Sequence, residues 1–79
     1  MNTLIIKKSE PLATDISFDE YNLIVEINDG RIVSVPLEWF PRLLNANKKQ
    51  RNNWRFIGNG IGIHWEDIDE DISVESLMN

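Results

Sequence analysis

The only histidine, His64, and the acids that follow it are the residues best suited to chemistry in this sequence. Glu66 and Asp67 stand close to it along the chain, and a general base needs a carboxylate nearby and a pocket. Nucleophilic chemistry would also need a cysteine or an activated serine. The chain has no cysteine, and none of its serines lies in a nucleophile-elbow context. We therefore interpret His64 as a structural or surface residue and expect no catalytic residue and no enzymatic activity.

The run DIDED, which begins at Asp67, has the acid spacing of the start of a calcium loop. An EF-hand loop also needs glycine at its sixth position and a bidentate glutamate at its twelfth. Counted from Asp67, those positions hold Ile72 and Met78, so the pattern fails. We expect no metal site and interpret the run as a solvated acidic link.

The segment GNGIG, which begins at Gly58, is only superficially similar to a phosphate-binding loop. The dinucleotide fingerprint needs a glycine at the sixth position and then a helix. Ile63 occupies that position, and the residues after it predict a strand. We expect neither nucleotide nor any other cofactor.

Charge is unevenly distributed along the chain, whose net charge is −5. The segment from Trp39 to Trp65 contains no acid, whereas the rest of the chain carries all 13 acids and only three bases. The five bases of that segment could contact nucleic acid; they are Arg42, Lys48, Lys49, Arg51 and Arg55. The acidity of the whole chain argues against strong binding to nucleic acid by the chain alone.

A cluster of acids follows Trp65 and could bind a basic protein partner. Its members are Glu66, Asp67, Asp69, Glu70 and Asp71. The alternative interpretation is that the acidic and basic residues lie on adjacent surfaces and compensate each other.

The segment from Trp54 to Trp65 is expected to form the hairpin that carries His64. Asn59 and Gly60 predict a two-residue type I′ turn, because that turn needs positive φ at both central positions. The resulting register pairs Trp54 with Trp65 and sets His64 opposite Arg55. Strand alternation then predicts one apolar face, made of Trp54, Phe56, Ile61, Ile63 and Trp65.

A second hairpin is expected from residues 23–27 and 31–35, joined through Asn28, Asp29 and Gly30. A three-residue loop with Gly30 in a left-handed bulge pairs Val25 with Val33, and this register gives one clean apolar face. A further strand is expected over residues 12–18, where apolar and polar residues alternate.

Short helices are expected between the two hairpins and after the second hairpin. Pro41 fits the first turn of a helix that begins near Trp39, because the first backbone N–H groups of a helix have no partner inside it. Asn47 and Gln50 predict a capping box at the start of a second, basic helix. Ser73 fits the N-cap of a last helical turn, within residues 72–79.

The elements predict one domain over residues 1–79, of the α+β class. We expect a small two-layer domain in which a mostly antiparallel sheet of β-hairpins is covered by the helical region 37–53. Residues 1–11 fit either an edge strand or a loose terminus. The expected core consists of Val25, Ile27, Val33, Val35, Trp39, Phe40, Leu43, Leu44, Trp54, Phe56, Ile63 and Trp65.

Composition also bears on location. The absence of cysteine fits a reducing compartment. No apolar run approaches the length that spans a membrane, and no signal-peptide pattern opens the chain. We therefore expect a cytoplasmic protein without a membrane partner.

Three ordered motifs resemble the bacterial family DUF2442, a domain of unknown function. They are DGR at residues 29–31, VPLEWFPRLLNA at 35–46 and GIHWEDIDEDISVESL at 62–77. The resemblance extends over about residues 13–77 and implies no established enzymatic activity. Members of the family are often encoded beside small proteins suspected to form toxin–antitoxin-like pairs with them, and some longer members carry a helix-turn-helix domain.

The resemblance and the charges together lead us to expect a non-enzymatic interaction module. It would be the antitoxin-like or regulatory partner of a small, basic, co-encoded protein, or a homodimer. The alternative is a transcription-related protein that contacts nucleic acid through its basic helical region.

Overall fold

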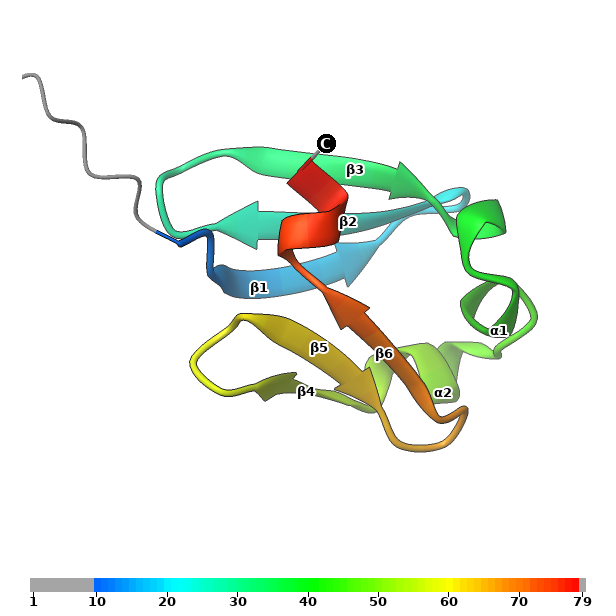
Figure 1. Cartoon of the computed structure of the whole chain (residues 1–79). Helices are drawn as coiled ribbons and strands as arrows, with labels where there is room; N and C mark the ends of the chain where they lie inside the picture. Colours follow the sequence, from blue (N-terminus) through cyan, green and yellow to red (C-terminus); the bar gives the residue numbers. More distant parts are fainter. Residues whose placement is uncertain (1–9, 79) are drawn as a thin grey trace, which may run out of the picture.

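The computed structural model describes residues 10–78, which form two three-stranded antiparallel sheets (Figure 1). The first sheet contains β1 (Ala13–Phe18), β2 (Asn22–Ile27) and β3 (Ile32–Pro36), in that order. The second contains β4 (Trp54–Ile57), β5 (Gly62–Trp65) and β6 (Glu70–Ser73). The helices are η1 (Leu37–Trp39), α1 (Pro41–Leu44), α2 (Lys48–Asn52) and η2 (Glu75–Met78). An edge strand or a loose terminus was expected for residues 1–11, and residues 1–9 of this segment lie outside the described residues.

The predicted α+β class with antiparallel hairpins is confirmed. The strands divide into two sheets, and the helical connection of residues 37–53 leads from β3 of the first sheet to β4 of the second. Figure 1 places α1 and α2 at one end of the two layers, beside the ends of β3 and β4. Leu37 of η1 and Leu43 of α1 are fully buried there and join the core between the sheets.

The register of the first sheet follows the prediction. Val25 pairs with Val33 and Leu23 pairs with Val35. Gly30 has a φ of +96° and its N–H donates to the carbonyl of Ile27 at 2.9 Å, which closes the three-residue loop. One face of β2 is therefore continuously buried.

The predicted pairing of β4 with β5 is also confirmed, because Trp54 pairs with Trp65. The predicted type I′ turn is wrong. Positive φ occurs at Gly58 and Gly60 and not at Asn59, and four residues, 58–61, follow β4 before β5 begins. Two glycines permit this wider loop, which leaves the side chain of Ile61 42% exposed instead of on the apolar face.

The acidic run continues into a strand, so the predicted solvated link is wrong for its second half. β6 pairs with β5 and sets Ile72 opposite Ile63. Ile72 and Val74 are buried, and this burial holds the acidic strand on the sheet. The last helical turn begins at Glu75, and Ser73, the expected N-cap, is instead the last residue of β6.

Most of the expected core is found in the interior. Buried members are Val25, Ile27, Val35, Leu43, Ile63 and Trp65. Partly buried members that pack on them are Val33, Phe40, Trp54 and Phe56. Trp39 and Leu44 were wrongly expected in the core, because they are 62% and 46% exposed. The helices η1 and α1 are each about one turn long, and each buries one residue, Leu37 in η1 and Leu43 in α1.

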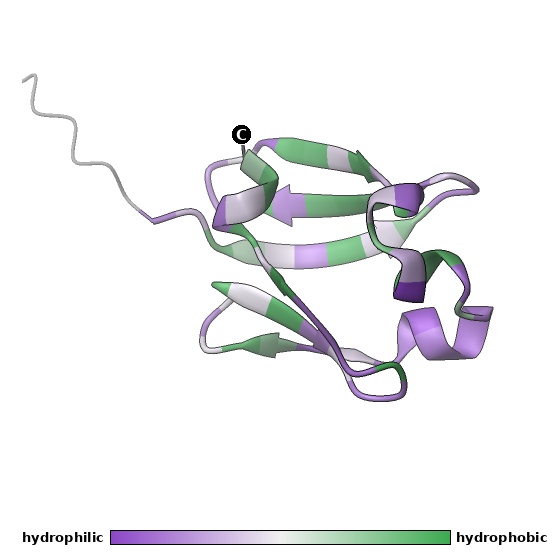
Figure 2. Cartoon of the chain, turned by 45° about the vertical axis from the view of Figure 1, so that its right-hand side comes forward, coloured by the Kyte–Doolittle hydropathy of each residue, from purple (hydrophilic) through white to green (hydrophobic). Residues whose placement is uncertain are grey.

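The predicted start signals of both short helices are found, although α1 begins at Pro41 and Trp39 belongs to η1. Pro41 is the first residue of α1, and the capping box at the start of α2 is complete. In that box the side chain of Asn47 accepts from the Gln50 N–H at 2.8 Å, and the Gln50 side chain accepts from the Asn47 N–H at 2.9 Å. No residue of α2 is buried, and Figure 2 shows its ribbon as hydrophilic throughout.

Arg51 joins α2 to the rest of the fold. Its Nε donates to the carbonyl of Leu43 at 2.9 Å and its Nη2 donates to the carbonyl of Leu44 at 3.0 Å, so the guanidinium satisfies the open end of α1. The guanidinium carbon lies 5.9 Å from the centroid of the Phe18 ring. The Arg51 carbonyl accepts the indole N–H of the fully buried Trp65 at 3.0 Å.

Gly60→Ala tests the contact between the two sheets. The carbonyl of Gly60 accepts the Ala13 N–H at 2.8 Å, and a Cβ at Gly60 would overlap the Ala13 backbone. Gly30→Ala is the matched control, since Gly30 also has positive φ but has nothing within 4 Å of a new Cβ. We expect Gly30→Ala to cost roughly 1–3 kcal/mol of unfolding free energy and Gly60→Ala clearly more. Equal losses in urea unfolding would contradict the close contact.

Arg51→Ala tests the anchoring of α2. We expect it to lower the free energy of unfolding by roughly 1.5–3 kcal/mol, because charge-assisted hydrogen bonds to two carbonyls are lost. Lys49→Ala removes the same charge from an exposed position of the same helix and should change stability by less than about 0.5 kcal/mol. Similar unfolding midpoints for the two variants would show that Arg51 acts only through its charge.

Asp19 should make stability depend on pH at the β1–β2 turn. The N–H of Tyr21, helped by the Asn22 side chain, holds the pKa of the Asp19 carboxyl below its ordinary value of 3.8. The stabilisation is therefore complete above that ordinary value and is lost as the pH falls through the lowered pKa. Carboxyl titration by NMR checks this. A value at or above the ordinary one would contradict the turn geometry.

Candidate functional site

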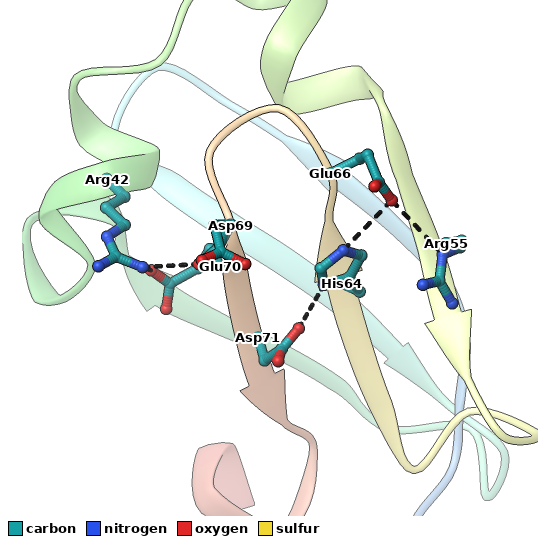
Figure 3. Close-up of polar contacts among 7 residues, drawn as sticks. All are labelled: Arg42, Arg55, His64, Glu66, Asp69, Glu70 and Asp71. Carbon is teal, nitrogen blue, oxygen red and sulfur yellow. Dashed lines mark hydrogen bonds and ion pairs between the residues drawn. The ribbon is translucent and has the colours of Figure 1, made fainter.

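The outer face of the second sheet carries a row of three ionisable side chains (Figure 3). Arg55 of β4 pairs directly with His64 of β5, and His64 pairs with Asp71 of β6. Side chains alternate along a strand, so this row faces away from the buried Ile63 and Trp65. His64 therefore lies opposite Arg55, as the predicted register required.

His64 lies between two carboxylates. Its Nε2 is 3.3 Å from Oε1 of Glu66, and its Nδ1 contacts Oδ1 of Asp71. A neutral imidazole carries only one N–H, so both contacts are hydrogen bonds only when the ring is protonated. The His64 side chain is 16% exposed and Oε1 of Glu66 is also 4.0 Å from Nε of Arg55, so the imidazole is a structural centre of this charged cluster.

The other acids of the predicted partner site also have neighbours within the chain. Nη1 of Arg42 donates to the backbone carbonyl of Asp69 at 2.6 Å and lies 4.0 Å from Oε1 of Glu70. Nδ2 of Asn53 donates to Oδ2 of Asp67 at 3.1 Å. The structure thus brings the acidic and basic segments of the sequence together on one side, as the compensation interpretation described.

The five predicted nucleic-acid residues have different neighbours in the fold. Arg42 and Arg55 contact acids beside β6 and β5, and the guanidinium of Arg51 holds the end of α1. Lys48 and Lys49 remain, at the exposed start of α2, and make no ion pair within residues 10–78. The side chains of Arg42 and Arg55 are also 61% and 66% exposed.

A hollow of about 370 Å³ lies beside the charged row. Ile57, Gly62 and Ser73 form the next row on the same face, and Gly62 has no side chain to fill it. The apolar part of the lining includes Ile57, Ile61 and Ile72. The charged part of the lining is acidic throughout and consists of Glu10, Asp71 and Glu75.

Sequence reasoning did not find this hollow. Glu10 precedes β1 and Glu75 follows β6, so only the folded chain brings them together. The signal that was present is Gly62, since a glycine inside a strand indicates a close approach or a bulge. A Cβ there would lie 3.2 Å from the Ile57 side chain and 3.2 Å from the Ile72 carbonyl, so these two groups approach the Gly62 backbone closely.

The charged side chains that line the hollow are all carboxylates, so its charge is complementary to that of cationic groups. Within residues 10–78, no group of three histidine or carboxylate side chains converges to hold a metal ion. The two ring nitrogens of His64 point to different carboxylates, so they do not share a ligand. The carboxylates of the hollow are better placed to pair with lysine or arginine side chains. In the same residues, no helix is long and apolar enough to cross a membrane.

Comparison with known proteins agrees with the motifs. The family model "Protein of unknown function (DUF2442)" matches residues 13–79. A crystal structure of a protein of unknown function from Rhodospirillum rubrum is 30% identical, with a TM-score of 0.76, and the match covers 89% of this chain and 87% of that chain. No curated protein matches. Because the family model spans most of the sequence, the chain belongs to the DUF2442 family.

Proposed function

We propose that this chain is a protein-interaction module that binds a basic partner at the hollow beside Asp71. The observation that carries the proposal is the lining of the hollow, which combines apolar side chains with three carboxylates and contains no basic residue. An occupant that matches it offers an apolar side chain beside lysine or arginine.

The apolar part of the hollow supplies the attraction. Ile61 is 42% exposed, and covering it would remove apolar surface from water. The volume of about 370 Å³ is at the lower end of the range for ligand pockets, which suits one or two side chains of a partner.

The carboxylates supply the orientation. Asp71 is held by its contact with His64, and Glu75 lies in the first turn of η2 at the other side of the hollow. Carboxylates around the hollow favour the approach of a positively charged surface and disfavour a negative one. Asp71 is the member of the predicted acidic set that lines the hollow.

The partner we propose is the product of a neighbouring gene, a small basic protein for which this chain is the antitoxin-like or regulatory companion. Charge complementarity supports this choice, because the chain has a net charge of −5. Contact with nucleic acid through the basic helical region has less support, since Arg42, Arg51 and Arg55 are engaged within the chain.

Co-expression with the native neighbouring genes tests the proposal, with size exclusion and light scattering as the measurement. We expect a stoichiometric complex with a small basic protein. The double variant Ile61→Ala with Glu75→Gln should weaken the complex about 10- to 100-fold, because it removes apolar contact and one charge pair. A lone monomer or homodimer would contradict the proposal that a co-encoded basic protein is the partner.

Matched controls separate the hollow from general charge and hydrophobicity. Glu26→Gln removes one exposed carboxylate from β2, and Ile32→Ala shortens a side chain that is 66% exposed on β3. Both should leave the complex intact. If the double variant and the controls bind equally well, the hollow is not the contact surface.

A further inference from the structure

A second hollow, of about 290 Å³, lies where the β1–β2 turn meets the end of β3 and the end of α1. It shares no lining residue with the hollow beside Asp71. Its apolar lining includes Tyr21 from the turn, Pro36 from β3 and Leu44 from α1. Tyr21 and Leu44 are 72% and 46% exposed, so large apolar side chains line a concave surface and remain open to water.

The backbone that carries Tyr21 is fixed. Oδ1 of Asp19 accepts the Tyr21 N–H at 2.9 Å, and the Tyr21 carbonyl accepts the Leu37 N–H at 2.8 Å. Asn22 then pairs with Pro36 in the first sheet. The turn is therefore tied both to its own strand and to η1, so little ordering of the backbone remains to oppose binding there.

The charge of this hollow identifies what it can bind. Glu20 and Glu38 are the charged residues of its lining, and neither forms an ion pair within the described part of the chain. The tyrosine hydroxyl adds a polar group beside an apolar ring. A complementary occupant therefore has an apolar side chain flanked by positive charges.

We propose that this second hollow docks an extended segment of another protein in which a leucine-like side chain stands next to lysine or arginine. The apolar side chain packs on Tyr21, Pro36 and Leu44, while the neighbouring cations pair with Glu20 and Glu38. The surface is independent of the hollow beside Asp71, and its test needs no co-encoded partner.

The test is an NMR titration of the ¹⁵N-labelled full chain with the blocked peptide Gly-Arg-Leu-Arg-Gly. We expect saturable shifts of the amide signals of Tyr21, Asn22, Glu38 and Leu44 at millimolar peptide. Gly-Glu-Leu-Glu-Gly should bind at least about tenfold more weakly because its charges are reversed. Gly-Arg-Gly-Arg-Gly should bind more weakly by a similar factor because it has no apolar side chain.

Two variants and one control localise the binding. Tyr21→Ala and Glu38→Gln should each raise the dissociation constant, the first by about tenfold. Ile32→Ala is the control, because Ile32 is as exposed as Tyr21 to within a few per cent (66% against 72%) and does not line the hollow. Amide spectra of each variant establish that it folds.

Three outcomes would overturn the proposal. The first is the absence of saturable shifts with Gly-Arg-Leu-Arg-Gly, and the second is binding that Tyr21→Ala leaves unchanged. The third is self-association, seen as concentration-dependent shifts of Tyr21 and Leu44 without peptide together with a dimer mass in light scattering. In that case a second copy of the chain covers the hollow. Failure of the co-expression experiment would not affect any of these readings.

Discussion

The hydrogen bond from the Trp65 indole to the Arg51 carbonyl is the contact on which the arrangement of sheets and helices depends. Trp65 is fully buried between the layers, and a buried N–H without a partner is costly. Its partner is on α2, a helix that buries no side chain of its own. The same residue, Arg51, also binds the end of α1 and lies over Phe18 of β1. The need of the buried Trp65 N–H for a hydrogen-bond acceptor therefore positions α2, a surface helix, against both sheets.

The acidic and basic residues are arranged differently in the fold than along the sequence. Along the chain, the basic segment and the acidic segment looked like two opposed surfaces for charged partners. In space, Arg42 lies beside Glu70 and Arg55 lies beside Glu66, so the two segments partly compensate each other locally. Carboxylates without an ion pair in the described residues include Glu10 and Glu75 at the first hollow and Glu20 and Glu38 at the second, next to apolar side chains. The folded chain thus offers small mixed surfaces instead of broad electrostatic patches.

Short-range patterns predicted much of this fold. Alternation together with Gly30 gave the register of β2 with β3, and alternation gave that of β4 with β5. Asn47 and Gln50 predicted the start of α2 because a capping box is local chemistry. β6 was not predicted, because its acidic residues indicated a solvated link. The strand is held on the sheet by the burial of Ile72 and Val74.

The candidate surfaces could not be found in the same way, because they depend on long-range contacts. The hollow beside Asp71 needs Glu10 and Glu75 from opposite ends of the described chain, and the second hollow needs a turn, a strand end and a helix end. The exposure of Trp39 and Leu44 likewise depends on which residue of a one-turn helix reaches the interior. Periodicity over so few residues does not decide that choice.

His64 has a practical consequence as a spectroscopic reporter. It is the only histidine of the chain, so its ring-proton resonances need no assignment by mutation. The imidazole is held between Glu66 and Asp71, and Asp71 is also part of the lining of the first hollow. A ligand that enters this hollow and pairs with the Asp71 carboxylate changes the environment of the His64 imidazole directly. The protein therefore carries a natural, unlabelled signal for occupancy of one of its two surfaces.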